Sequence, residues 1–114
     1  MDMLVWSSNI YMDEKIARRR KKYEKSLKKR RQLKSIYCIT LPVNGKNMME
    51  IYSSGELWFQ YYREQKLTLI GLAKTMEGAQ KLVAQICLDR VREDGDVTPE
   101  ILRNYFEDSK EEGV

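Results

Sequence analysis

The pattern of apolar residues after residue 35 predicts two strands. Residues 36–41 are rich in β-branched and aromatic side chains and stop at Pro42, which is typical of a strand. Residues 67–73 are almost continuously apolar, which favours a second strand buried on both faces. If helical segments join the two strands, the strands should be parallel and the connection between them should be a right-handed crossover.

The stretch between these strands, residues 47–64, fits two interpretations. Asn44-Gly45 is a hairpin signal that would give an antiparallel β-meander followed by helices. The other interpretation is two short helices, at about 48–54 and 56–64, because apolar residues recur there at i, i+3 and i+4. We favour the two helices and keep the meander as the alternative.

The last third of the chain predicts two helices. Thr75 would cap a long amphipathic helix over residues 76–93, which Gly95 would end. Thr98 would cap a shorter helix with Pro99 at its first position, where proline is favoured. The apolar positions of the long helix are Ala79, Leu82, Val83, Ile86, Cys87 and Val91, and those of the short one are Ile101, Leu102, Tyr105 and Phe106.

Residues 13–34 predict a basic helix ahead of the first strand. The segment has no glycine or proline and consists mostly of good helix formers. Asp13 and Glu14 lie at its N-terminal end, where carboxylates interact favourably with the helix dipole. Its apolar positions are sparse and lie roughly on one stripe: Ile16, Tyr23 and Leu27. Like charges repel at i, i+4, so an isolated helix would be marginal and would gain from an anionic partner.

These elements predict one small α/β (α+β) domain with an N-terminal basic helix, two short strands joined by a helical crossover, a long amphipathic helix and a short C-terminal helix. A chain of 114 residues is of single-domain length. We divide it into an N-terminal extension (1–12), a basic helical arm (13–34), a compact α/β domain (35–108) and an acidic tail (109–114). Two strands make a poor sheet and so small a core supplies only about 3–5 kcal/mol, so homodimerisation would remedy both deficits.

Charge is distributed unevenly along the chain. The formal net charge is +4, yet residues 1–34 carry 12 basic and 4 acidic side chains, whereas residues 35–114 carry 9 and 13. The basic run predicts an arm that binds nucleic-acid phosphates, DNA or RNA, with salt-dependent affinity and little sequence preference. The cations assigned to this role are Lys15, Arg18, Arg19, Arg20, Lys21, Lys22, Lys25, Lys28, Lys29, Arg30, Arg31 and Lys34.

Other partners for the arm stay open. It could bind an acidic protein, with the whole chain acting as an adaptor or inhibitor module, or it could dock on the acidic C-terminal half of its own chain. A membrane surface is a weaker candidate because the apolar face lacks the bulk to insert. The aromatic residues Trp58, Phe59, Tyr61 and Tyr62 would supply the docking patch for a protein partner. We favour the simpler interpretation that these rings fill the core or a dimer seam.

Catalytic and cofactor chemistry has little support in the sequence. The chain has no histidine, which removes the commonest general base and the commonest metal ligand. Cys38 and Cys87 fall on apolar faces and predict buried structural thiols. Residues 71–75 lack the glycines of a nucleotide-binding loop, and helix capping by Thr75 explains them better. We therefore predict a non-enzymatic protein with no metal and no cofactor.

The sequence also bears on where the protein acts. No apolar run approaches the ~20 residues of a bilayer span. The first eleven residues carry an acidic Asp2 and only a short apolar core, unlike a secretory signal. Two cysteines do not suggest a secreted disulfide framework. These features predict a cytoplasmic protein.

Overall fold

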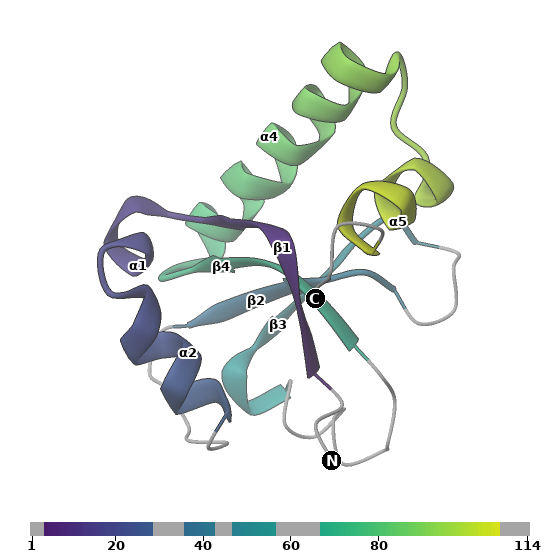
Figure 1. The fold of residues 1–114 in the computed structure, drawn as a ribbon. Helices are drawn as coiled ribbons and strands as arrows, with labels where there is room; N and C mark the ends of the chain where they lie inside the picture. The colour runs from purple at the N-terminus through teal and green to yellow at the C-terminus, as the bar shows by residue number, and fades with distance from the viewer. Residues whose placement is uncertain (1–3, 29–35, 43–46, 57–66, 108–114) are drawn as a thin grey trace.

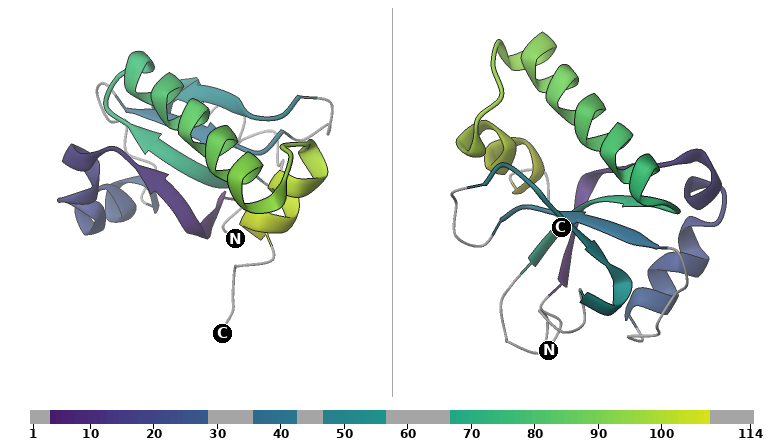
Figure 2. Two further views of the ribbon diagram at one scale, coloured as in Figure 1. Left: turned by 90° about the horizontal axis from the view of Figure 1, so that it is seen from above. Right: turned by 180° about the vertical axis from the view of Figure 1, so that it is seen from behind.

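The computed structural model describes residues 4–28, 36–42, 47–56 and 67–107, which form a four-stranded mixed sheet with helices on both faces (Figures 1 and 2). The mixed α+β class expected from the sequence is confirmed. The strand order is β1-β4-β2-β3. The strands are β1 (Leu4–Met12), β2 (Tyr37–Thr40), β3 (Glu50–Ser53) and β4 (Leu67–Ala73). The helices are α1 (Glu14–Ala17), α2 (Arg20–Lys28), α4 (Met76–Asp94) and α5 (Pro99–Glu107).

Strand β1 occupies residues expected to form an N-terminal extension, and it is part of the sheet. It lies at one edge and pairs in parallel with β4, with Trp6 opposite Leu69. The three polar residues at its centre, Ser7 to Asn9, interrupt the apolar alternation that would have marked a strand in the sequence.

Two of these polar side chains are satisfied by the end of a distant helix. Ser7 Oγ donates a hydrogen bond of 2.9 Å to the carbonyl of Phe106, and Asn9 Nδ2 donates one of 3.0 Å to the carbonyl of Tyr105. Both carbonyls belong to the last turn of α5, where the helix has no amide of its own to offer them. The polar residues of β1 therefore dock α5 onto the sheet.

The expectation of two parallel strands joined by a helical crossover is wrong. Strand β2 runs antiparallel to β4, with Cys38 opposite Leu72, and the parallel neighbour of β4 is β1. The antiparallel meander is only partly realised, since β4 inserts between β1 and β2 and leaves β3 at the outer edge. The segment of chain that connects β1 to its parallel neighbour β4 contains α1, α2, β2 and β3.

The helix expected over residues 48–54 is also wrong, because strand β3 occupies residues 50–53. Pairing with β2 places Tyr52 opposite Cys38 on one face and Ile51 opposite Ile39 on the other. This period-two burial stabilises the strand although the segment by itself fits helical spacing. The second expected helix, at 56–64, lies almost entirely outside the described residues.

Each face of the sheet carries its own hydrophobic cluster. Leu69 and Leu72 point to the side of α1 and α2, whereas Ile70 and Ala73 point to the side of α4 and α5. The irregular β4 register beside β2 coincides with Gly71, where a Cβ atom would lie 2.7 Å from Ile39 Cδ1. Gly71 is therefore a packing residue inside a strand and not part of a phosphate loop.

The two C-terminal helices follow the expected boundaries closely. Thr75 Oγ1 accepts a hydrogen bond from the amide of Gly78 (2.9 Å), and Gly95 ends α4 with a left-handed φ of 85°. Thr98 Oγ1 likewise accepts from the amide of Ile101 (3.1 Å) at the start of α5. Val91, which was expected on the buried face of the long helix, is instead 45% exposed.

Candidate nucleic-acid interface

Asp13 fixes the start of the basic segment. Its Oδ1 accepts a hydrogen bond from the amide of Ile16 (2.9 Å), which caps α1, and its Oδ2 accepts one from the amide of Lys74 (2.8 Å). The amide of Asp13 in turn donates to the carbonyl of Leu72 (3.1 Å). One residue thus joins the carboxyl end of β1 to the carboxyl end of its parallel neighbour β4.

The single helix expected over residues 13–34 is wrong within the described part, where it forms two helices separated by a turn at Arg18–Arg19. Five consecutive cations occupy residues 18–22, and a straight helix would stack their like charges at i, i+3 and i, i+4. The helix is instead interrupted at Arg18–Arg19, and Ile16 and Tyr23 belong to the same hydrophobic cluster on the sheet. Residues 29–34 lie outside the described part of the chain.

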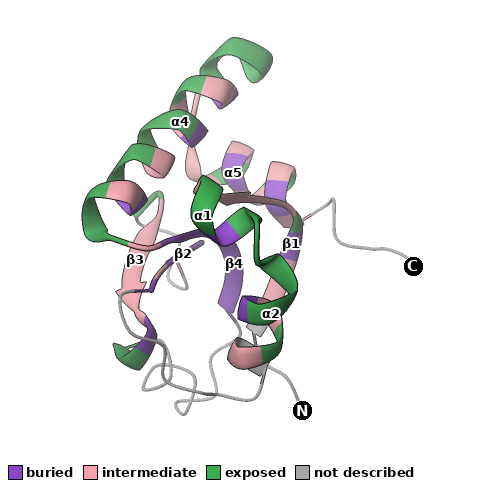
Figure 3. Cartoon of the chain, turned by 90° about the vertical axis from the view of Figure 1, so that its left-hand side faces the viewer, coloured by how far each residue is buried: buried purple, intermediate pink, exposed green. Residues whose placement is uncertain are grey.

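The described part of the basic segment, residues 13–28, is docked on the domain. Ile16 is 0% exposed and Tyr23 is 8% exposed, and both belong to the hydrophobic cluster beneath α1 and α2 that includes Leu72. Figure 3 shows the remaining surface of the two helices as mostly exposed. Of the stripe expected from the sequence, Leu27 has no described side chain.

Seven of the twelve predicted phosphate-binding cations are described, and all seven are exposed. We call these seven residues together the α1–α2 basic surface: Lys15, Arg18, Arg19, Arg20, Lys21, Lys22 and Lys25. The side chains of the other five lie outside the described part of the structure: Lys28, Lys29, Arg30, Arg31 and Lys34.

Lys74 joins this surface from a distant part of the sequence. Its Nζ lies 3.5 Å from the hydroxyl of Tyr23 and 6.0 Å from the centroid of that ring, while Lys22 Nζ lies 5.7 Å from the same centroid. Lys74 was absent from the predicted site because 40 residues separate it from the end of the basic run, Lys34. Its place at the end of a strand leading into a helix was the one available signal.

The basic surface has little internal neutralisation among the described residues. Its one ion pair there joins Arg18 to Glu14 at 3.3 Å, with both side chains more than 70% exposed, so the pair contributes little stability. Glu93 and Asp94 instead pair with Arg90 on the opposite face of the sheet. Intramolecular docking of the basic segment on these acidic residues is therefore not what the described structure shows.

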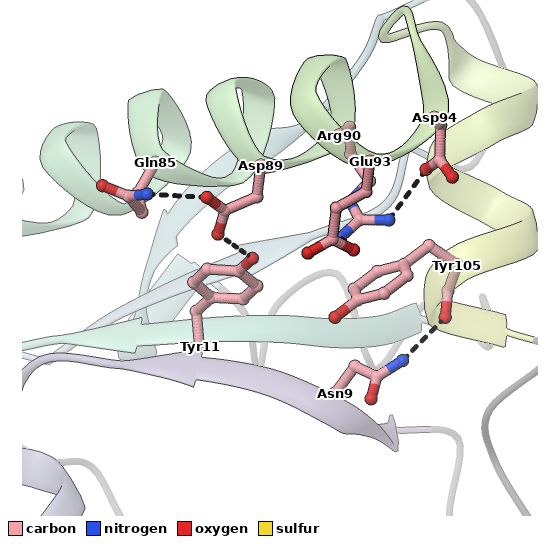
Figure 4. Close-up of polar contacts among 8 residues, drawn as sticks. All are labelled: Asn9, Tyr11, Gln85, Asp89, Arg90, Glu93, Asp94 and Tyr105. Carbon is pink, nitrogen blue, oxygen red and sulfur yellow. Dashed lines mark hydrogen bonds and ion pairs between the residues drawn. The ribbon is translucent and has the colours of Figure 1, made fainter.

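The opposite face holds a polar network that packs α4 against β1 and α5 (Figure 4). Arg90 is 2% exposed, and its guanidinium carbon lies 3.5 Å from the ring centroid of Tyr105. Tyr11 Oη donates a hydrogen bond of 2.5 Å to Asp89, which also accepts one of 2.7 Å from Gln85. Burial and this bond raise the pKa of Tyr11, and the same bond lowers the pKa of Asp89. The network stabilises helix packing.

Of the remaining candidate residues, the structure describes only the two cysteines. Cys38 is fully buried and burial raises its pKa to about 12, which fits the expected structural thiol. Cys87 is half-buried, and burial raises its pKa as well. The aromatic residues Trp58, Phe59, Tyr61 and Tyr62 lie outside the described residues.

Searches for similar proteins found no matching family model, curated protein or solved structure. Within the described ranges, no helix is long and apolar enough to cross a bilayer.

Proposed function

We propose that the α1–α2 basic surface binds nucleic-acid phosphates through charge, with little sequence preference and without catalysis. The observation that carries the proposal is that α1 and α2 each bury a large apolar side chain and expose their described basic ones. Ile16 and Tyr23 fix the helices on the sheet, while the seven described cations face outward. A protein that neutralises phosphates releases condensed counterions, which gives the binding free energy without base contacts.

The shortage of other functional groups on this surface supports the same conclusion. Tyr23, its one described aromatic ring, is buried and cannot stack on a base. Lysine and arginine contacts to phosphate fix position and carry no sequence information. The proposal therefore predicts similar affinity for nucleic acids of unrelated sequence.

The test is fluorescence anisotropy of labelled duplex DNA, duplex RNA and single-stranded DNA over a series of salt concentrations. Wild type is compared with a double variant of the surface, R19Q/K22Q. The matched control is K81Q/R92Q, which removes the same charge from exposed positions of α4. On duplex DNA each lost phosphate contact reduces the slope of log K against log salt by about 0.9.

We expect R19Q/K22Q to weaken binding to every sequence and to flatten the salt slope, with K81Q/R92Q close to wild type. Equal losses in the two variants would show that net charge and not this surface determines binding. Absence of binding at low salt, where electrostatic attraction is strongest, would overturn the proposal. An acidic protein would then be the partner to seek.

A further inference from the structure

A depression lies where the α1–α2 basic surface meets the junction of β4 and α4. Its volume is about 320 Å³, close to the lower end of small-ligand sites at about 300 Å³. Its described lining contains four cations and one phenol, and no carboxylate: Lys15, Arg18, Arg19, Lys74 and Tyr23. Four like charges at one concave place repel one another, so an anion bound there would relieve that repulsion.

The position of Lys74 is fixed independently of any ligand. Its amide is held by Asp13, and its Nζ lies 3.5 Å from the hydroxyl of Tyr23, whose ring is buried. The depression also lies at the carboxyl ends of β1 and β4, a neighbouring parallel pair. Ligands of open sheets with parallel strands commonly bind outside these ends.

The donors suit a compact anion with several terminal oxygens. Arginine can form two parallel hydrogen bonds to a phosphate, lysine supplies a point charge, and a phenol can donate one more bond. A backbone phosphodiester carries a single charge, whereas a phosphate monoester carries about −1.5 to −2 at pH 7 and three terminal oxygens. Four cations match the monoester better.

We propose that this depression binds a phosphate monoester, supplied by the terminal phosphate of a nucleic-acid strand. The inference rests on the proposed function, because the strand must first be held by the α1–α2 basic surface. A free mononucleotide presents the same chemical group, so the experiment separates the two sources.

The test uses one internally labelled DNA strand with a 5′-phosphate, a 3′-phosphate or no terminal phosphate. Wild type should bind one of the phosphorylated strands about tenfold more tightly, the ratio that one charge-assisted hydrogen bond provides. In K74Q the ratio should fall to about one, while binding of the unphosphorylated strand should weaken no more than in K21Q. K15Q alters the same depression at an exposed position and should also reduce the ratio.

The matched control is K21Q, which removes the same charge from an exposed residue that does not line the depression. It should weaken all strands equally and keep the ratio. Circular dichroism checks that every variant is folded. Equal binding of the three strands by wild type, or an unchanged ratio in both K74Q and K15Q, would overturn the inference while leaving the proposed function intact.

Calorimetric titration with adenosine 5′-monophosphate and with adenosine distinguishes the remaining outcomes. If no strand binds, the proposed function fails. In that case, heat of binding that is seen with adenosine 5′-monophosphate and lost in K74Q would support the depression as a site for a free mononucleotide. Absence of that heat, together with absence of strand binding, would overturn the inference as well.

Discussion

The amide of Lys74 donates a hydrogen bond of 2.8 Å to Oδ2 of Asp13, although the two residues are 61 positions apart. The other carboxylate oxygen of Asp13 caps α1 by accepting from Ile16. The same side chain therefore sets where α1 begins and where the junction of β4 and α4 lies. This contact is why Lys74 becomes part of a surface otherwise built from consecutive residues.

Replacing Asp13 by alanine should destabilise the domain by about 2–3 kcal/mol. Loss of a helix N-cap costs about 1–2 kcal/mol, and loss of the second hydrogen bond costs about 1 kcal/mol more. The measurement is urea unfolding followed by circular dichroism. Thr75→Ala removes the cap of α4 alone and should cost only about 1 kcal/mol. Equal costs for the two variants would show that the bond to Lys74 contributes nothing.

Replacing Ile16 by alanine should destabilise the domain by about 2–5 kcal/mol, because a fully buried isoleucine leaves a cavity. Lys22→Ala, at an exposed position of the neighbouring helix, should stay within about 0.5 kcal/mol of wild type. Thermal unfolding monitored by circular dichroism distinguishes them. Wild-type stability in Ile16→Ala would mean that the basic segment is not docked on the sheet in solution.

Replacing Tyr11 by phenylalanine should flatten the dependence of stability on pH. The raised pKa of Tyr11 stabilises the fold below its ordinary value of 10.0, and this contribution is lost as pH rises above 10.0. The lowered pKa of Asp89 contributes above its ordinary value of 3.8 and is lost as pH falls below it. Tyr11→Phe removes the contribution of the phenol at alkaline pH and weakens the contribution of Asp89 at acid pH.

Urea unfolding at pH 3, pH 7 and pH 10.5 tests this expectation. Gln85→Ala provides the control, because it removes the other hydrogen bond to Asp89 and leaves the phenol of Tyr11 in place. It should reduce the acid dependence and keep the alkaline one. An alkaline loss of stability in Tyr11→Phe equal to that of wild type would contradict the assignment.

The candidate site divides between what is local in the sequence and what is not. The seven described cations lie within eleven consecutive residues, and their exposure follows from charge alone, since burying them unpaired would be costly. The depression could not be predicted in the same way. It needs Lys74, which arrives through the pairing of β1 with β4 and the bond to Asp13.

The fold divides along the same line. Thr75 and Gly95 set both ends of α4, and Thr98 and Pro99 set the start of α5, through contacts within a few residues. Both helices could therefore be predicted from local sequence. Strand β1 depends on α5 carbonyls nearly a hundred positions away, and β3 depends on its pairing with β2. These two strands could be recognised only in the folded protein, because their polar groups and alternating faces become favourable only when a distant partner is in place.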